Sequence, residues 1–266
     1  MAELTQRDVA YEANGTRMIG CLVAPVGAAG ADASALAAGG PAAESRPGIL
    51  LVHDAFGLGA DTIDLAARYA ELGYAVFAAD MWGERTEPQG GADIGRLIGS
   101  MAANRGEWMS RLGAAHEAAA AQPEFDADRT VIVGACFGGS SALEYVRTGA
   151  PVVAAVSIHG GLDLVAHDWS AAIGSATVLL CTGADDPMAG PEHWQPIKAG
   201  LTGAGIDWEF DLYSGTRHAF TNPKTDALGM PGAAFHPRNA ARAWARTVDF
   251  LGEVTGAAAG IRSSAR

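Results

Sequence analysis

The stretch Val131-Ile132-Val133-Gly134-Ala135-Cys136-Phe137-Gly138-Gly139 decides the fold of this 266-residue chain. An apolar run ends here at a glycine-marked turn, and a helical pattern over residues 140–146 follows directly. This order of strand, turn and helix is that of the G-x-S-x-G nucleophile elbow, with Cys136 in the place of the serine. The nucleophile of so sharp a turn has a strained backbone. Its neighbours two positions away on each side are therefore glycines, which have no side chain to block the turn.

The surroundings predicted for Cys136 favour a reactive thiol. The N–H groups at the start of the following helix stabilise a thiolate and can bind an oxyanion. The alternative is a glycine-rich turn that holds a buried, inert cysteine. A phosphate loop is disfavoured because no lysine follows the glycines, and their spacing fits neither the P-loop nor the dinucleotide-binding fingerprint.

Short apolar runs alternate with helical patterns on both sides of this motif. Large apolar side chains at helical spacing predict helices over residues 65–72, 94–101 and 244–251. The apolar run at 208–212 alternates with polar residues and is expected near a sheet edge. Five other runs are continuous, as in strands buried on both faces: 49–52, 75–79, 131–133, 152–158 and 177–181.

The N-terminal region predicts a β-hairpin. Residues 8–13 and 16–24 are joined through Asn14-Gly15, which tolerates the positive φ of a tight turn. Together with the alternating strands and helices, this hairpin predicts an α/β fold with a mostly parallel central sheet and helices on both faces. One domain over residues 1–266 is the economical interpretation, with a flexible Ala/Gly-rich loop at 26–47 and a frayed tail at 256–266.

Composition and charge exclude several classes of protein. Hydrophobic residues make up 49% of the chain and charged residues 18%, which is enough apolar material for a sizeable core. The formal net charge of −12 argues against binding to nucleic acid or to an anionic membrane surface. No apolar run approaches the roughly 20 residues of a membrane helix, and the N-terminus lacks the pattern of a secretory signal. A cytoplasmic location is expected.

Partners for Cys136 follow from the order nucleophile, acid, histidine that this architecture requires. Asp186, with Asp185 as the fallback, follows the apolar run at 177–181, and functional groups in open α/β sheets lie at that end of a strand. His218 follows the run at 208–212 and precedes the last helical pattern, where the base of such a triad belongs. Each residue also has an ordinary interpretation, the aspartates as turn or helix-capping residues and the histidine as a structural one.

The other histidines support no metal site, because none has H-x-H or H-E-x-x-H spacing. The three cysteines likewise show neither a disulfide framework nor metal-ligand spacing, so no metal is expected. His116 is interpreted as an ordinary helix residue. His53 and His159 each end an apolar run, so they either line a cleft or serve as hydrogen-bonded scaffolding.

Two backbone N–H groups are candidates for an oxyanion hole. One belongs to Phe137, directly after the nucleophile. The other belongs to Ala55, in the loop His53-Asp54-Ala55-Phe56-Gly57 that follows the first core strand. Asp54 would project near the thiol, where its negative charge would raise the pKa of the thiol or its carboxylate would accept a hydrogen bond from the thiol. The alternative is that Asp54 only caps the next segment.

On these residues the sequence resembles the dienelactone hydrolase family of α/β-hydrolases, from about residue 48 to residue 251. The motifs that carry the resemblance are His53–Gly57, Gly134–Gly139, Ser157-Ile158-His159-Gly160-Gly161, Gly183-Ala184-Asp185-Asp186-Pro187 and Tyr213-Ser214-Gly215-Thr216-Arg217-His218-Ala219-Phe220. The resemblance implies an α/β-hydrolase fold, a triad of Cys136, Asp186 and His218, and an acidic residue beside the oxyanion loop, a place that Asp54 holds.

The chain departs from the family at the two arginines that hold the substrate carboxylate. Glu84 stands at the aligned position of one, with Arg85 a single step out of register, and Asn222 stands at the position of the other. These differences weaken the case for an anionic dienelactone as substrate.

The leading functional hypothesis is a cofactor-free hydrolase of a small carboxylic ester or lactone, acting through a thioester on Cys136. Its pocket is expected to be formed by Asp54, Phe56, Trp82, Arg85, Phe137 and Phe220, with residues 91–112 as a partial cover. A thioesterase or acyltransferase with the same triad is one alternative, and a non-catalytic ligand-binding or thiol-sensing protein is another. The predicted partner is a small molecule and the predicted assembly is a monomer or a small homo-oligomer.

Overall fold

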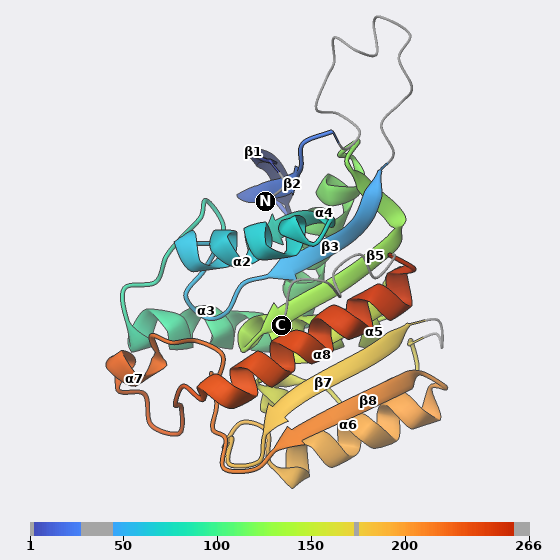
Figure 1. The fold of residues 1–266 in the computed structure, drawn as a ribbon. Helices are drawn as coiled ribbons and strands as arrows, with labels where there is room; N and C mark the ends of the chain where they lie inside the picture. The colour runs from blue at the N-terminus through green and yellow to red at the C-terminus, as the bar shows by residue number, and fades with distance from the viewer. Residues whose placement is uncertain (1–2, 28–44, 173–175, 258–266) are drawn as a thin grey trace, which may run out of the picture. The chain divides into compact units, whose positions relative to one another are not determined.

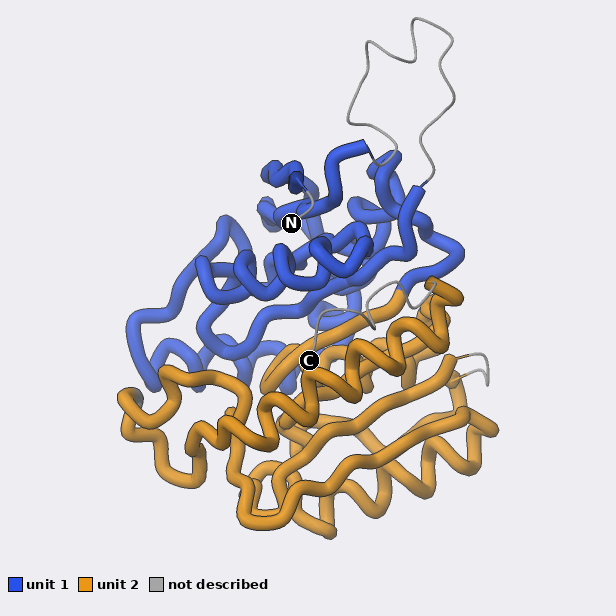
Figure 2. Tube along the Cα trace, in the orientation of Figure 1, with its two compact units in different colours: residues 1–130, 259–266 blue, residues 131–258 orange. Residues whose placement is uncertain are grey.

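A computed structural model describes residues 3–27, 45–172 and 176–257 (Figure 1). The described chain forms two compact units, residues 1–130 and residues 131–258 (Figure 2). Most of the predicted loop at 26–47 and of the predicted tail at 256–266 lies outside the described residues. Residues 26–27 form a turn, and strand β3 begins at Arg46, inside the predicted loop.

The strands form a mixed sheet in the order β1-β2-β4-β3-β5-β6-β7-β8. Strands β1 and β2 are antiparallel, as are β2 and β4, whereas β3–β4, β5–β6, β6–β7 and β7–β8 pair in parallel. The predicted sheet with its N-terminal hairpin is confirmed, and β8 lies at the edge as expected. The strands are β1 (Leu4–Ala13), β2 (Thr16–Pro25), β3 (Arg46–Val52), β4 (Ala75–Ala79), β5 (Phe125–Ala135), β6 (Ala154–Ile158), β7 (Thr177–Gly183) and β8 (Asp207–Tyr213).

The first unit contains the hairpin and strands β3 and β4, with helices α2 (Ala60–Glu71), α3 (Gly91–Ala103) and α4 (Arg105–Ala120). The turn between β1 and β2 has positive φ at both Asn14 and Gly15, which suits the right-handed twist of the paired strands. Asn104 separates α3 from α4 and caps α4, because its side chain accepts a hydrogen bond from the N–H of Glu107 at 3.1 Å.

The second unit contains β6, β7, β8 and the end of β5, with helices α5 (Phe137–Arg147), α6 (Pro191–Gly203), the short α7 (Thr225–Leu228) and α8 (Pro237–Thr255). A single 3-10 turn, η1 (Leu162–Leu164), follows β6. Helix α8 covers one face of the strands in this unit, and α5 and α6 cover the other (Figure 1). The strands β6 and β7 are buried almost throughout, which explains their continuous apolar sequence.

Within residues 3–27, 45–172 and 176–257, no helix is long and apolar enough to cross a lipid bilayer.

Candidate active site

The turn between β5 and α5 carries Cys136 in a strained conformation. Its φ of 54° and ψ of −119° lie in a region that side-chain-bearing residues rarely adopt. A Cβ on Gly134 would lie 2.2 Å from the carbonyl carbon and oxygen of Gly138, so the turn closes only because Gly134 has no side chain. The N–H of Cys136 donates to the carbonyl of Ile158 at 3.1 Å, which ties the turn to the end of β6.

Helix α5 approaches the end of β6 more closely than side chains would permit. A Cβ on Gly139 would lie 2.9 Å from the Cα of Gly160 and 2.8 Å from the hydroxyl oxygen of Ser157. The third glycine of the motif is therefore required by the packing of the helix, whereas Gly134 is required by the turn itself.

Three predicted residues come together in the second unit. The Nε2 atom of His218 lies 3.2 Å from the sulfur of Cys136, and its Nδ1 atom lies 2.8 Å from Oδ2 of Asp186. His218 is buried, with 1% of its surface exposed, while Cys136 is partly exposed. The order thiol, imidazole, carboxylate is that of a nucleophile, a base and the group that orients the base.

The other oxygen of Asp186 also has a partner. Oδ1 accepts a hydrogen bond from the N–H of Met188 at 2.9 Å, which fixes the carboxylate in the turn after β7. Asp185 is exposed, and its backbone N–H donates to the carbonyl of Thr216 at 2.9 Å. Of the two aspartates that the sequence left open, the one that contacts His218 is Asp186.

The charge on His218 reflects two opposing effects. Burial disfavours the imidazolium, but the hydrogen bonds and charges of Asp186 and Cys136 outweigh it and raise the pKa of His218 to about 10. At neutral pH this favours a cationic ring between the Cys136 sulfur and the Asp186 carboxylate.

The loop that carries His218 is anchored on both sides. Asn239, in the first turn of α8, donates from its side chain to the hydroxyl of Thr216 at 2.6 Å. The backbone N–H of His218 donates to Gly232 at 3.1 Å, and the carbonyl of His218 accepts from Ala234 at 3.1 Å. These bonds hold the loop between α8 and the segment after α7, so the ring of His218 has a rigid support.

The predicted residues after β3 lie in the first unit. Asp54 accepts a hydrogen bond from the N–H of Phe56 at 2.9 Å, which stabilises the turn after β3. Ala55 is buried, and Phe56 is half-buried. His53 is buried, with Nδ1 2.6 Å from the carbonyl of Asp54 and Nε2 accepting from the N–H of Met81 at 3.1 Å. These two contacts give His53 the scaffolding role.

The guanidinium of Arg85 is already engaged within the first unit. It donates to the carboxylate of Asp8 at 2.6 Å and to the carbonyl of Ile19 at 3.2 Å, so it fastens the hairpin. Trp82 is buried against the ring of His53, with a centroid distance of 5.2 Å. Trp82 and Arg85 share an anchor in the buried carboxylate of Asp80, which accepts from both of their backbone N–H groups.

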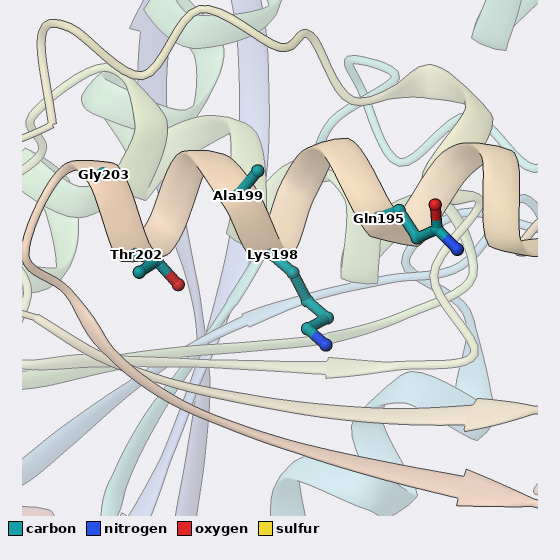
Figure 3. A pocket seen from close by; sticks show the side chains of 5 residues that line it. All are labelled: Gln195, Lys198, Ala199, Thr202 and Gly203. Carbon is teal, nitrogen blue, oxygen red and sulfur yellow. The ribbon is translucent and has the colours of Figure 1, made fainter.

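The remaining predicted pocket residues belong to the second unit. Phe137 and Phe220 are both fully buried. A surface hollow of about 510 Å³ lies along α6 in the same unit (Figure 3) and contains none of the predicted residues; its lining comprises Gln195, Lys198, Ala199, Thr202 and Gly203. The described residues contain no group of three or more His, Cys, Asp or Glu side chains able to hold a metal ion.

One residue of the site has a role that the sequence left undecided. His159 directly follows β6, is 3% exposed and packs its ring against that of His218 at a centroid distance of 5.3 Å. Its Nε2 atom lies 2.8 Å from the hydroxyl of Thr221. Two signals in the sequence marked this residue, its position after an apolar run and its place in the motif at residues 157–161. The first signal also fits His53, and neither shows which groups the ring contacts.

Comparisons with known proteins identify the family to which the chain is similar. The sequence profile of the "Dienelactone hydrolase family" matches residues 34–255. A Salmonella typhimurium protein named "Putative carboxymethylenebutenolidase" is 26% identical over 218 residues, which cover 79% of this chain and 78% of that protein.

Solved structures extend the similarity to the fold. The dienelactone hydrolase-like promiscuous phosphotriesterase P91 from metagenomic libraries superposes with a TM-score of 0.84 at 32% identity, over 96% of this chain and 99% of that chain. The structure of m3DLH gives a TM-score of 0.81 at 30% identity, over 95% and 99% of the two chains. With the profile match over most of its length, this chain belongs to the dienelactone hydrolase family of α/β-fold hydrolases.

Proposed function

We propose that this protein hydrolyses a small carboxylic ester or lactone through a covalent thioester on Cys136, with His218 as the base and Asp186 as the group that orients it. One observation carries the proposal. His218 lies within hydrogen-bond distance of both the Cys136 sulfur, at 3.2 Å, and the Asp186 carboxylate, at 2.8 Å.

In the first half of the reaction the Cys136 thiolate attacks the carbonyl carbon of the substrate. The C=O electron pair moves onto oxygen to give a tetrahedral oxyanion. When that intermediate collapses, the C–O bond to the alcohol breaks, and the leaving oxygen takes the proton from Nε2 of the His218 imidazolium. The products are the free alcohol, or the opened ring of a lactone, and a thioester on Cys136.

In the second half the neutral His218 takes a proton from water, and the resulting hydroxide equivalent attacks the thioester carbon. Collapse of the second tetrahedral intermediate breaks the C–S bond and releases the carboxylic acid, whose proton is lost to solvent at neutral pH. The Cys136 thiolate and the His218 imidazolium are regenerated. Asp186 stays ionised and stabilises the imidazolium throughout the cycle.

The oxyanion needs hydrogen-bond donors, each worth roughly 10²–10³ in rate in such sites. Phe137 is the first residue of α5, so its N–H points out of the N-terminal end of the helix and is the first proposed donor. Ala55 remains the proposed second donor on the sequence argument alone. Asp54, Phe56, Trp82, Arg85 and Phe220 remain proposed pocket residues on the same basis.

The decisive experiment is a stopped-flow acylation burst with p-nitrophenyl acetate, an activated aryl ester. Wild-type protein is expected to release close to one equivalent of nitrophenol per chain before steady turnover, because the thioester accumulates. Cys136→Ala is expected to lose the burst and to lower turnover at least 10³-fold. Cys21→Ala is the matched control, since Cys21 is a buried cysteine of β2, and its burst should remain.

Turnover that is unchanged in Cys136→Ala would contradict the proposal. It would favour the alternative of a non-catalytic protein that binds a ligand or senses oxidants through the Cys136 thiol. Both other cysteines are buried, and burial raises the pKa of Cys181 to about 12, so neither is a ready partner for a disulfide with Cys136.

The remaining alternative activities differ from ester hydrolysis in the group that leaves the acyl carbon or in the molecule that accepts the acyl group. A thioesterase or acyltransferase would use the same three residues, and the same burst assay with an acyl-CoA beside aryl and alkyl esters separates these activities. Phosphotriesters belong in the panel as a second candidate class, because P91, at 32% identity, is described as a promiscuous phosphotriesterase. We further propose that the protein is cytoplasmic and acts as a monomer or a small homo-oligomer. It is proposed to need no cofactor and to bind neither nucleic acid nor a membrane.

A further inference from the structure

His159 is held in a backbone conformation that is unusual for its residue type. Its φ is 37°, in the left-handed region where glycine is favoured, and the neighbouring loop residue Ala219 has a φ of 53°. The backbone N–H of His159 donates to the carbonyl of Cys181 at 2.7 Å, which fixes this position at the end of β6. Strained residues of this kind persist where the surrounding structure requires them, and they concentrate at functional sites.

Every side-chain contact described for His159 is made to one segment, residues 218–221. Its ring meets the ring of His218 edge to face, with a centroid distance of 5.3 Å and an interplanar angle of 73°. It meets the ring of Phe220 in the same manner, at 5.3 Å and 72°. The Nε2 atom lies 2.8 Å from the hydroxyl of Thr221. The side chain therefore supports the loop that carries the proposed base at three points.

The ring of His159 is neutral. Burial first, and then the positive charge of His218, hold the pKa of His159 well below its usual value. Its Nδ1 atom is buried and has no hydrogen-bond partner among the residues that the structure describes, so a proton there would be uncompensated. A neutral ring can pack against a cationic His218 without repulsion, which a second imidazolium could not do.

We propose that His159 is a positioning residue for His218. Its neutral ring keeps the His218 imidazole in the orientation that directs Nε2 at Cys136 and Nδ1 at Asp186. This inference rests on the proposed function of His218 as the base and deepens it. A displacement of about 1 Å in such a group costs on the order of 10²-fold in rate, so the support of the ring is expected to matter for turnover more than for binding.

The test compares three substitutions in the p-nitrophenyl acetate assay. His159→Ala removes the ring and is expected to lower kcat and the acylation rate by about 10- to 100-fold, with KM within threefold of wild type. His159→Phe keeps a ring of similar shape and is expected to stay within about fivefold of wild-type kcat. His159→Gln keeps a hydrogen-bonding group for Thr221 but has no ring, and it is expected to behave like the alanine variant.

Two controls separate positioning of His218 from a general loss of stability and from a failure of the Cys136 assignment. Ile197→Ala removes a fully buried side chain from α6 in the same unit and is expected to lower the unfolding midpoint with kcat within twofold of wild type. If the alanine variant of His159 does not fold, the comparison of His159→Phe with His159→Gln carries the test. Cys136→Ala is measured alongside, because its failure to abolish the burst would overturn the proposed function itself.

The outcomes are distinct. Loss of kcat in His159→Gln, with retention in His159→Phe, supports the inference. Equal losses in these two variants, or an effect on KM alone, would overturn it while leaving the role of Cys136 intact. Wild-type kcat in both would overturn it as well.

Discussion

Asp185 and Asp186 are adjacent in the chain and differ completely in their surroundings. Asp186 is 3% exposed, and both of its carboxylate oxygens accept hydrogen bonds, one from Met188 and one in the contact with His218. The side chain of Asp185 is exposed, and only its backbone takes part in holding the loop, through the carbonyl of Thr216. A single peptide step therefore separates a group that can orient an imidazole from a group exposed to solvent.

Substitution of these two residues tests the assignment. Asp186→Asn is expected to lower kcat/KM for an aryl ester roughly 10³- to 10⁴-fold, because the amide cannot stabilise the imidazolium and favours the wrong tautomer. Asp185→Asn, the matched control, is expected to stay within about threefold of wild type. Steady-state kinetics at pH 7 measure both. A larger loss in the Asp185 variant than in the Asp186 variant would reverse the assignment.

At the scale of secondary-structure elements, the junction of β5 and α5 depends on the absence of side chains. Gly134 faces the backbone of Gly138, and Gly139 faces Ser157 and Gly160, each at a distance that a Cβ could not occupy without a shift. This close packing lets the strand end, the strained Cys136 and the first turn of the helix follow one another without a connecting loop. The Cys136 thiol is thus presented by two rigid elements.

A methyl group at this junction is expected to disrupt it. In Gly134→Ala the Cβ would lie 2.2 Å from backbone atoms of Gly138, so the turn has to open, and we expect kcat to fall at least 10²-fold with a stability loss of about 1–3 kcal/mol. Gly113→Ala is the control, because its Cβ would meet nothing within 4 Å on helix α4.

The Gly113→Ala variant is expected to keep wild-type activity. Its free energy of unfolding is expected to rise by about 0.5–1 kcal/mol, because alanine loses less conformational entropy than glycine when a helix forms. Urea unfolding and the aryl ester assay measure both properties. Wild-type activity in Gly134→Ala would mean that the turn tolerates a different geometry.

The elements were predictable to different degrees, for physical reasons. Strand β4 has the bounds expected from its continuous apolar run. Strand β5 begins six residues before the predicted run, at Phe125, because its first half contains Asp126, Asp128 and Arg129 and lacks the pattern of a buried strand. Helix α6 was not predicted, since its sequence contains proline at both Pro191 and Pro196. Proline at the first helical position is favourable, because the N–H that it lacks would have no partner within the helix.

At the scale of the whole molecule, each unit contains a buried histidine that is neutral in the folded state. Burial lowers the pKa of His53 to about 4, and burial together with the charge of His218 lowers that of His159 well below its usual value. Unfolding exposes both rings, and a histidine in water takes up a proton near pH 6.5. Between pH 6.5 and the folded pKa the unfolded chain therefore binds protons that the folded chain does not, so stability falls as the pH falls.

For His53 alone the loss can be estimated. A depression of the pKa from 6.5 to about 4 corresponds to about 3 kcal/mol of folding stability, lost as the pH decreases from 6.5 to 4. His53→Gln keeps an acceptor for the N–H of Met81 and does not titrate. The unfolding free energy of this variant is expected to fall less than that of wild type between pH 6.5 and pH 4. The difference between the two decreases is expected to reach at most about 3 kcal/mol.

Urea denaturation at pH 7 and at pH 4.5 measures this difference. The contributions of His116 and His159 are present in both proteins and cancel in the comparison. Identical pH dependence in the two proteins would show that His53 is not neutral in the folded state.

The sequence by itself determined the alternation of strands and helices, the hairpin and the elbow, because periodicity, glycine placement and turn chemistry are properties of neighbouring residues. It also determined which residue types were available as thiol, base and acid. Only the tertiary structure decided that Asp186 rather than Asp185 contacts His218, that Arg85 binds Asp8, and that His159 contacts the loop of His218. These contacts join residues far apart in the chain, 82 positions in the case of Cys136 and His218, so they depend on strand order and packing, which no local pattern encodes.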